Sequence, residues 1–338
     1  MQQNPVSPSY IAAELQARDH WANHGFSEAA NSSRNAAEIA LRDGDAESWC
    51  NMTFFQAESL LAAGQFDECV EVAAALVREP HAGGAQLQAR VRILMSKAWQ
   101  GAGLLDKAAE DARVAIELLV DDADAEVNVT ARLALIAALG ESGELDEAWT
   151  ESLNLADVVS VEVNDQLLGN AYWVIGNAAF LTNRVEDGLR YHELAAETFS
   201  PARNLEVWAR FNNASAAMRL AADVADAATL RCIERAELAT DVIGGSKENI
   251  LLQKLNRGHW NYLAGDPATA VDLLTDVRSG ADILPPQVLG EACLLLGRAH
   301  HALGAAAKVQ LLEAAGYFET AGAQQRADHT RAILTALG

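Results

Sequence analysis

The sequence predicts an all-α protein, built as a right-handed α-solenoid of about eight helical pairs. Three observations predict this fold. Alanine supplies 67 of the 338 residues, whereas there are only 23 glycines and 7 prolines. Alanine is the strongest helix former, and glycine and proline are the weakest. The third observation is a sequence repeat of about 40 residues, which is typical of stacked helical hairpins.

The repeat is marked by a short turn of the form Gly-x-apolar-acid-x-small. Clear copies begin at Gly25, Gly64, Gly103 and Gly143, and weaker copies begin at Asn183, Asp223, Gly265 and Gly304. These eight positions are almost evenly spaced along the chain. Glycine and asparagine accept the left-handed conformation that ends many helices. Each copy therefore predicts the end of one helix and the start of a second one.

Small side chains recur at two fixed distances from these turns. Five residues after the turn come Ala30, Cys69, Ala108, Ala148, Gly188, Ala228, Ala270 and Val309. Seven residues before it come Ala57, Ser96, Ile136, Gly176, Ala216, Gly258 and Gly297. Small residues at a constant position allow two helices to approach closely, so these two columns are the predicted packing core of each helical pair.

The pattern resembles the tetratricopeptide repeat, which has a small residue within its first helix and a Gly-x-Leu-Asp-Glu-Ala type of turn. The matching residues are Gly176, Tyr172–Trp173, the Gly64–Phe66–Asp67–Glu68 turn and the Gly143–Leu145–Asp146–Glu147–Ala148 turn. HEAT repeats share the period but lack this turn. Two features depart from the family pattern. The period is about 40 rather than 34 residues, and Ala73, Ala112 and Ser152 replace the aromatic residue of the second helix.

This longer variant resembles the sensor arrays of bacterial signalling regulators. The resemblance covers nearly the whole chain. It implies a single superhelical array over residues 9–338. We expect residues 1–8, which include two prolines, to be a frayed lead.

Charge and hydropathy narrow the classes of function. The net charge is −22 and the pI is about 4.6, which disfavours direct nucleic-acid binding through phosphate neutralisation and disfavours anionic membranes. We therefore expect neither nucleic acid nor membrane as a partner. We also expect no membrane span and no secretory leader, because no apolar stretch has the required pattern. The four cysteines are far apart in the sequence. These features favour a cytoplasmic protein.

The sequence shows no signature of an enzyme or of a cofactor site. The chain has no phosphate-binding loop, no nucleophile elbow and no His-Glu-x-x-His motif. His20 and His24 share a helix face, but a metal site needs a third ligand, and none is evident. We expect no catalytic residues, no metal and no cofactor.

The family resemblance implies that the first helix of each pair lines a concave groove, at positions 13, 10, 6, 3 and 2 before the turn. The candidate ligand-binding residues in these columns are Asn51, Arg90, Lys97, Asn170, Trp173, Asn177, Phe180, Arg210, Asn213, His259, Tyr262 and Arg298. The same columns also hold Phe54, Glu58, Leu61, Ile93, Thr130 and Glu291. Asparagine amides can pair with a peptide backbone, and arginine can bind a carboxylate in bidentate fashion. We expect Asn170, Trp173, Asn177, Arg210 and Asn213 to cluster at the middle of the groove.

Two interpretations of function follow. The first is a non-enzymatic protein- or peptide-binding module that holds an extended segment in its groove. The alternative is the N-terminal sensory or oligomerising region of a larger bacterial signalling protein, a diguanylate cyclase or transcription regulator, with its effector domain beyond residue 338. The alternative depends on an expected lack of a polar capping helix, which would leave Tyr317–Phe318 and Ile333–Leu334 only partly covered. The sequence leaves a homodimer open and does not identify the partner.

Overall fold

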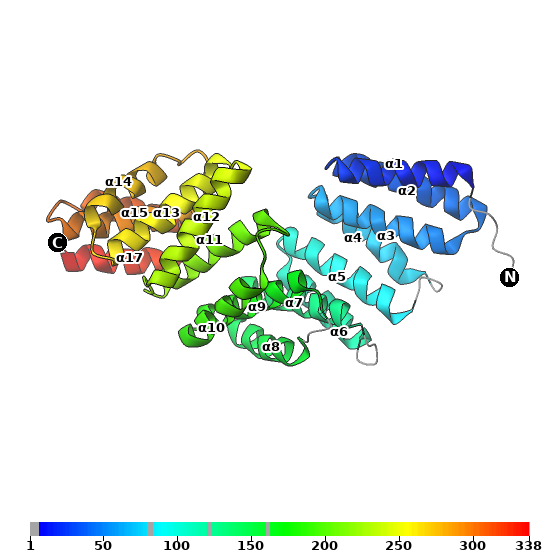
Figure 1. Ribbon diagram of the computed structural model, residues 1–338, viewed down its shortest axis with the longest axis horizontal. Coiled ribbons are helices and arrows are strands. Elements are labelled where there is room, and N and C mark those ends of the chain that lie inside the picture. The colour runs from blue at the N-terminus through cyan, green and yellow to red at the C-terminus, as the bar shows by residue number, and fades with distance from the viewer. Residues whose placement is uncertain (1–6, 80–83, 120–123, 160–162, 338) are drawn as a thin grey trace. The chain divides into compact units, whose positions relative to one another are not determined.

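A computed structural model describes residues 7–79, 84–119, 124–159 and 163–337. Within these residues the chain forms seventeen α-helices and no β-strand (Figure 1). The helices are α1 (Pro8–Ala22), α2 (Phe26–Asp43), α3 (Ala46–Ala62), α4 (Phe66–Arg78), α5 (Ala85–Gly101), α6 (Leu105–Leu118), α7 (Ala125–Ser142), α8 (Leu145–Val158), α9 (Asp165–Leu181), α10 (Val185–Thr198), α11 (Leu205–Ala221), α12 (Ala227–Ile243), α13 (Lys247–Leu263), α14 (Pro267–Arg278), α15 (Pro286–Ala302), α16 (Lys308–Thr320) and α17 (Gln324–Leu337). The all-α prediction is confirmed, whereas the right-handed winding stays a prediction.

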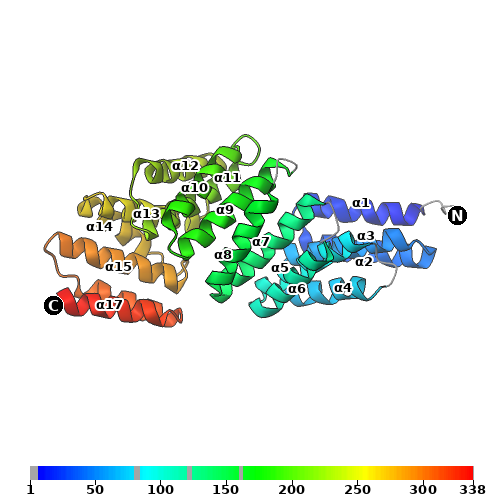
Figure 2. The ribbon, with the colours of Figure 1, turned by 90° about the horizontal axis from the view of Figure 1, so that it is seen from below.

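The chain forms two compact units, residues 1–191 and 192–338, so the boundary falls within α10. In each unit, helices that follow one another in sequence pack as hairpins (Figures 1 and 2). The odd-numbered helices, here called the first helices, also pack on one another. In the first unit α3 contacts α5, α5 contacts α7 and α7 contacts α9; in the second, α11 contacts α13 and α13 contacts α15. Each unit therefore has a layer of first helices. The side of this layer that faces away from the second helices is called the first-helix face. The predicted single array over residues 9–338 stays a prediction.

The predicted turns connect the helices of each hairpin. Seven of the eight predicted turn residues have a positive φ, between 57° at Asp223 and 87° at Gly265. The first turn is the exception, because His24 has the left-handed conformation (φ 58°) and Gly25 precedes α2 with φ −81°. The first predicted turn position was therefore wrong by a single position.

A polar residue before most first helices fixes where the helix begins. The side chains of Asp45, Asp124, Asn164, Asn204 and Ser246 each accept a hydrogen bond from the backbone N–H three residues later. Such a cap satisfies one of the N–H groups that a helix leaves unpaired at its start. All five lie at the same distance in sequence before the turn residue of their hairpin, so the capping position repeats with the hairpin. Ser7 caps α1 in the same way, and α1 begins at Pro8, the last residue of the predicted lead; residues 1–6 lie outside the described residues.

The small-residue columns are buried for most of their length. Ala57, Cys69, Ala108 and Ala216 are fully buried, and Ala148 is 1% exposed. Val309 was predicted to belong to this core, but it is 59% exposed. The reason is that α16 begins four residues after Gly304, whereas most second helices begin two residues after their turn. Leu311 takes the buried position instead, and its side chain packs on Gly297.

Ion pairs within hairpins reinforce the first unit. The guanidinium of Arg92 on α5 contacts Asp111 on α6 at 2.6 Å, and Asp111 also accepts a hydrogen bond from the indole N–H of Trp99 at 3.0 Å. One repeat later, Arg132 on α7 pairs with Glu151 on α8. These pairs occupy equivalent positions in successive repeats, so they hold the first helix to the second.

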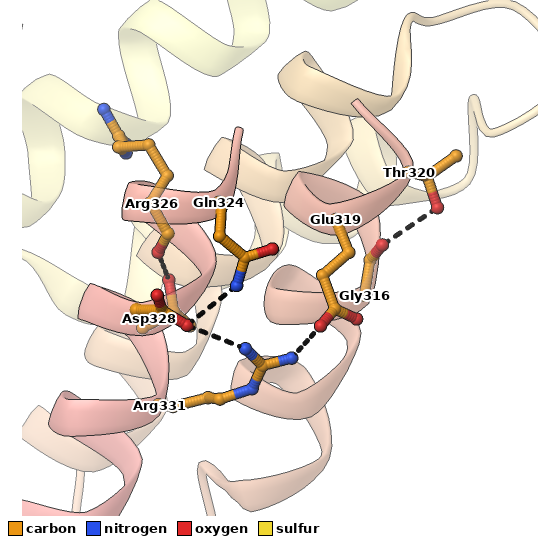
Figure 3. A network of polar contacts seen from close by, with 8 residues as sticks. Gly316, Glu319, Thr320, Gln324, Arg326, Asp328 and Arg331 are labelled. Carbon is orange, nitrogen blue, oxygen red and sulfur yellow. Dashed lines mark hydrogen bonds and ion pairs between the residues drawn. The ribbon is translucent and has the colours of Figure 1, made fainter. Parts of the chain in front are cut away.

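A further helix, α17, follows the last hairpin of the second unit, where we expected no polar capping helix. α17 packs on α16, and Phe318 is only 1% exposed because Cys293, Leu311 and Ala327 surround it. The expectation that Phe318 would be only partly covered was therefore wrong, whereas Tyr317, Ile333 and Leu334 are partly buried. Figure 3 shows how α17 is held. Arg331 pairs with Glu319 of α16 and, at 3.0 Å, with Asp328 of its own helix.

Candidate functional site

A cavity of about 710 Å³ lies on the first-helix face of the first unit. Residues from α1, α3, α5, α7 and α9 line it. All five predicted groove positions contribute: Arg90, Thr130 and Asn170 from position 13, Phe54 and Ile93 from position 10, Glu58 and Lys97 from position 6, Leu61 from position 3, and Ala62 from position 2. Stacked first helices place equivalent positions side by side, so residues one repeat apart in sequence share one wall. The volume is that of an ordinary small-molecule or peptide pocket.

Three charged side chains from two neighbouring first helices line the cavity. The carboxyl of Glu58 comes from α3, and the guanidinium of Arg90 and the ammonium of Lys97 come from α5. Burial raises the pKa of the Glu58 carboxyl, and the positive charges of Arg90 and Lys97 oppose that rise. Burial lowers the pKa of the Lys97 ammonium, and the charge of Glu58 opposes that shift. The side chain of Lys97 is exposed, but the protein around its ammonium group still lowers the pKa of that group.

Arg90 is oriented by an aromatic ring. Its guanidinium lies over the ring of Phe54 on α3, 4.7 Å from the ring centroid. A cation over an aromatic face is stabilised by the ring quadrupole, the more so when water is partly excluded. This contact fixes the position of the Arg90 side chain but leaves its N–H groups available.

A row of hydrogen bonds between repeats forms one edge of the cavity. Gln86 of α5 donates to Asp124, the residue that caps α7. Asn164, the residue that caps α9, donates to Glu126 of α7 at 2.8 Å. Both bonds join the starts of neighbouring first helices. The two acidic side chains of this edge are therefore engaged by neighbouring amides.

The first unit contains seven of the twelve predicted ligand-binding residues. Arg90, Lys97 and Asn170 line the cavity, whereas exposed Asn51 on α3 is outside its lining. The other three, Trp173, Asn177 and Phe180, lie partly buried on α9. The ring of Phe180 packs against Gly188 of α10, so part of this side chain belongs to the hairpin core.

The second unit contains the other five, on α11, α13 and α15: Arg210, Asn213, His259, Tyr262 and Arg298. Arg210 is exposed, and the side-chain oxygen of Asn213 accepts a hydrogen bond from the Asn256 amide at 2.8 Å. Tyr262 packs against the buried cluster around Leu274 and Leu295. The predicted mid-groove cluster draws on both units and stays a prediction.

His259 is the most strongly perturbed titratable group of this face. Burial lowers the pKa of its imidazole to about 4; the positive charges of Arg298 and Arg326 contribute to that shift, and Asp223 opposes it. The imidazole is therefore neutral at physiological pH.

Sequence reasoning missed the edge residues Gln86, Asp124, Glu126 and Asn164. Their signal was present in the repeat. Asp124 and Asn164 occupy the capping position of their hairpins, which is usually Asp, Asn or Ser, and Gln86 and Glu126 share a second position close to it. Glu58 is among the predicted groove positions but outside the predicted ligand-binding set, although it is one of the three charged residues of α3 and α5 that line the cavity.

The described part of the chain offers no resident metal site and no membrane span. No group of three or more His, Cys, Asp and Glu side chains among those residues is placed to hold a metal ion. None of the helices described here has the length and apolar character needed to cross a bilayer.

Comparisons with known proteins place the fold. No protein-family model and no curated protein sequence matches the chain. The crystal structure of the APC/C hetero-tetramer Cut9-Hcn1 is similar, with a TM-score of 0.58 and 12% identity over 96% of this chain and 57% of that one. This chain thus spans little more than half of that structure's length. Aspartyl phosphate phosphatase F from Bacillus subtilis has a TM-score of 0.55 and 11% identity over 100% of this chain and 96% of its own.

A tetratricopeptide repeat protein from Parabacteroides merdae has a TM-score of 0.50 and 11% identity over 87% of this chain and 99% of its own. At such low identity the likeness concerns the fold. The fold is that of tetratricopeptide-repeat proteins.

Proposed function

We propose that this tetratricopeptide-repeat-like chain is a non-enzymatic binding module that holds an extended peptide, or a segment of a partner protein, on its first-helix face. The observation that carries the proposal is the cavity of the first unit, because residues from five sequence columns converge on it. Apolar side chains combined with partly desolvated charges in one cavity are typical of binding sites.

The lining suits a polypeptide. Phe54, Ile93 and Leu61 provide apolar walls for side chains. The amide of Asn170 can donate to and accept from a peptide backbone, and Arg90 can bind a carboxylate. In the Cut9-Hcn1 hetero-tetramer a protein of this fold is assembled with a second protein, which is consistent with a role in protein interaction here.

The proposal includes the predicted mid-groove residues. Asn170 and Asn177 would pair with the ligand backbone, Trp173 would cover an apolar side chain, and Arg210 would bind a carboxylate. Each lies on a first helix at position 13, 10 or 6 before a turn.

The test is a binding measurement with the full chain. A fluorescent peptide selected from a random-peptide display library is titrated against the protein, and fluorescence polarisation reports binding. We expect Arg210→Ala to weaken binding by about 1.5–3 kcal/mol, the range for charge-assisted hydrogen bonds, and Asn177→Ala to weaken it less. Arg231→Ala is the matched control, because Arg231 is exposed on α12, a second helix of the same unit.

Two outcomes would contradict parts of this proposal. If the selected peptide binds equally well to both groove variants and to Arg90→Ala, the first-helix face is not the binding surface. If no peptide with measurable affinity is selected, the binding-module function itself fails.

A further inference from the structure

The lining of the first-unit cavity includes charges that the fold leaves without a polar partner. Among the described residues, Glu58, Arg90 and Lys97 form no hydrogen bond and no ion pair, although all three line the same cavity. The other two charged side chains of the lining, Asp124 and Glu126, are engaged by the amides of the cavity edge. The protein thus offers one carboxylate and two cations to whatever enters.

Protein partly replaces water around two of these groups, Glu58 and Lys97. Burial opposes the charged forms of both Glu58 and Lys97, and each is only partly compensated by the opposite charge across the cavity. A desolvated charge without a hydrogen-bonding partner destabilises a fold, and a partner of opposite charge removes that cost. A ligand that pairs with both signs at once would therefore be stabilised by groups already in place.

The apolar walls limit what the rest of this ligand can be. Bulky apolar side chains from four helices line the same cavity: Phe54, Leu61, Ile93, Leu94, Val127 and Leu167. They would contact an apolar substituent of similar size. The ligand that fits has a carboxylate, an ammonium group close to it, and an apolar side chain.

We propose that this cavity binds a free α-amino acid with a bulky apolar side chain, its carboxylate on Arg90 and Lys97 and its ammonium group on Glu58. This inference goes beyond the proposed peptide function, because neither end of a peptide has both charges on one carbon. A peptide C-terminus offers a carboxylate next to a neutral amide, and a peptide N-terminus offers an ammonium group next to a neutral carbonyl.

The same charges disfavour small ligands that carry charge of one sign only. A dicarboxylate or a phosphate would bring a second negative charge towards Glu58, which has no proton to donate when ionised. A simple amine would bring its positive charge towards Arg90 and Lys97. A ligand that carries both signs can place each charge beside its opposite, whereas a ligand of one sign is repelled by one of the two kinds of group.

Isothermal titration calorimetry with three matched probes tests the inference on the full chain. The probes are L-phenylalanine, N-acetyl-L-phenylalanine, which lacks the ammonium group, and L-phenylalaninamide, which lacks the carboxylate. We expect L-phenylalanine to bind, and each blocked probe to bind about 10- to 100-fold more weakly, because each loses a charge-assisted contact. Absence of binding by L-phenylalanine, or equal binding by either blocked probe, overturns the inference.

Variants assign each end of the ligand to its partner. Glu58→Gln should abolish the preference for L-phenylalanine over its N-acetyl form, and Lys97→Met should reduce the preference over its amide. A merely structural role would not change these ratios. Glu110→Gln and Lys308→Met are the controls, because both residues are exposed on other helices. If Glu58→Gln retains the full preference, the assignment of the ammonium group to Glu58 is overturned.

The outcome is separable from that of the proposed function. A selected peptide that binds while L-phenylalanine does not would overturn this inference alone. L-phenylalanine that binds while no peptide is selected would overturn the peptide function alone.

Discussion

The first-helix faces of the two units share the same sequence columns but use their polar residues differently. In the first unit Glu58, Arg90 and Lys97 face a cavity without pairing. In the second unit, Glu291 pairs with Arg326 and Asn213 with Asn256. The repeat period thus decides which residues lie on the face, whereas neighbouring helices decide which of them remain available to a ligand.

Both units have ion pairs within hairpins, including that of Lys254 on α13 with Asp276 on α14 in the second unit, but they differ in whether an ion pair involves a groove position. In the first unit Arg92 and Arg132 pair with acids inside their own hairpins, away from the cavity. In the second unit Arg326 comes from α17, a helix beyond the repeats, and reaches a groove position of α15. This helix thus provides an ion-pair partner for a charge at a groove position of the second unit. Four measurements would test this difference between the units.

The largest effect should come from His259 on the second face. Its pKa is about 4 in the folded protein, against about 6.5 in an unfolded chain. The unfolded chain therefore takes up the proton first as the pH falls. The free energy of unfolding should have its full value above pH 6.5 and should fall between about pH 6.5 and 4, by at most about 3 kcal/mol.

Urea denaturation at pH 7 and pH 4.5 measures this effect in the parent and in His259→Gln. The variant should lose less stability between the two pH values than the parent does. His329→Gln is the control, because His329 is exposed on α17. An unchanged pH dependence in His259→Gln would show that the second face is as well solvated as an ordinary surface, and the comparison would fail there.

The next effect concerns the hairpin ion pairs of the first unit. Arg132→Met should leave the carboxylate of Glu151, whose side chain is only 13% exposed, without its cation. We expect the free energy of unfolding to fall by about 1.5–3 kcal/mol, the range for hydrogen bonds to charged groups. Chemical denaturation of Arg132→Met and of the double variant with Glu151→Leu checks the cause. If the second change restores no stability, the loss arises from packing and not from an unpaired charge.

The small-residue columns give the third test. Ala148→Leu should force the helices of its hairpin apart and cost about 1–3 kcal/mol by overpacking, and Gly176→Leu in the next repeat should behave alike. Val309→Leu, from the corresponding column of the second unit, should be nearly neutral because Val309 is exposed. Thermal unfolding followed by circular dichroism compares the three. A destabilising Val309→Leu would show that the repeat continues in register through α16.

The outcome for Val309 illustrates what the sequence could and could not predict. Turn residues such as Gly143 and Gly265 carry a local signal, because few residue types accept a positive φ, and their period predicted the hairpins. After Gly304 the sequence continues with three alanines, which are compatible with several starting points for a helix. The start of α16 is decided by the burial of Leu311 against Gly297, a contact that no local signal reports.

The candidate site shows the same limit. The columns predicted that Glu58 and Glu291 lie on the first-helix face, because that depends only on their distance from a turn. They could not predict that Glu291 is paired and Glu58 is not. Glu291 is paired because α17, which lies outside the repeat pattern, provides Arg326. Glu58 is unpaired because neither Arg90 nor Lys97 forms an ion pair with it, although all three line one cavity.

The smallest effect tests the ion pair that distinguishes the second face. The side chain of Arg326 is 50% exposed and that of Glu291 is 29% exposed, and exposed pairs contribute little because water screens them. Arg326→Met should therefore lower the free energy of unfolding by less than about 1 kcal/mol. Arg326 also lies over the ring of Phe318, 5.0 Å from its centroid, so the single variant mixes two contacts. A double-mutant cycle with Glu291→Gln isolates the ion pair, because the ring contact is lost equally on both sides of the cycle.

A small coupling energy of favourable sign would confirm that α17 engages the groove position of α15. A coupling of zero would mean that Glu291 is as free as Glu58, and the two faces would then differ in sequence but not in the availability of their charges.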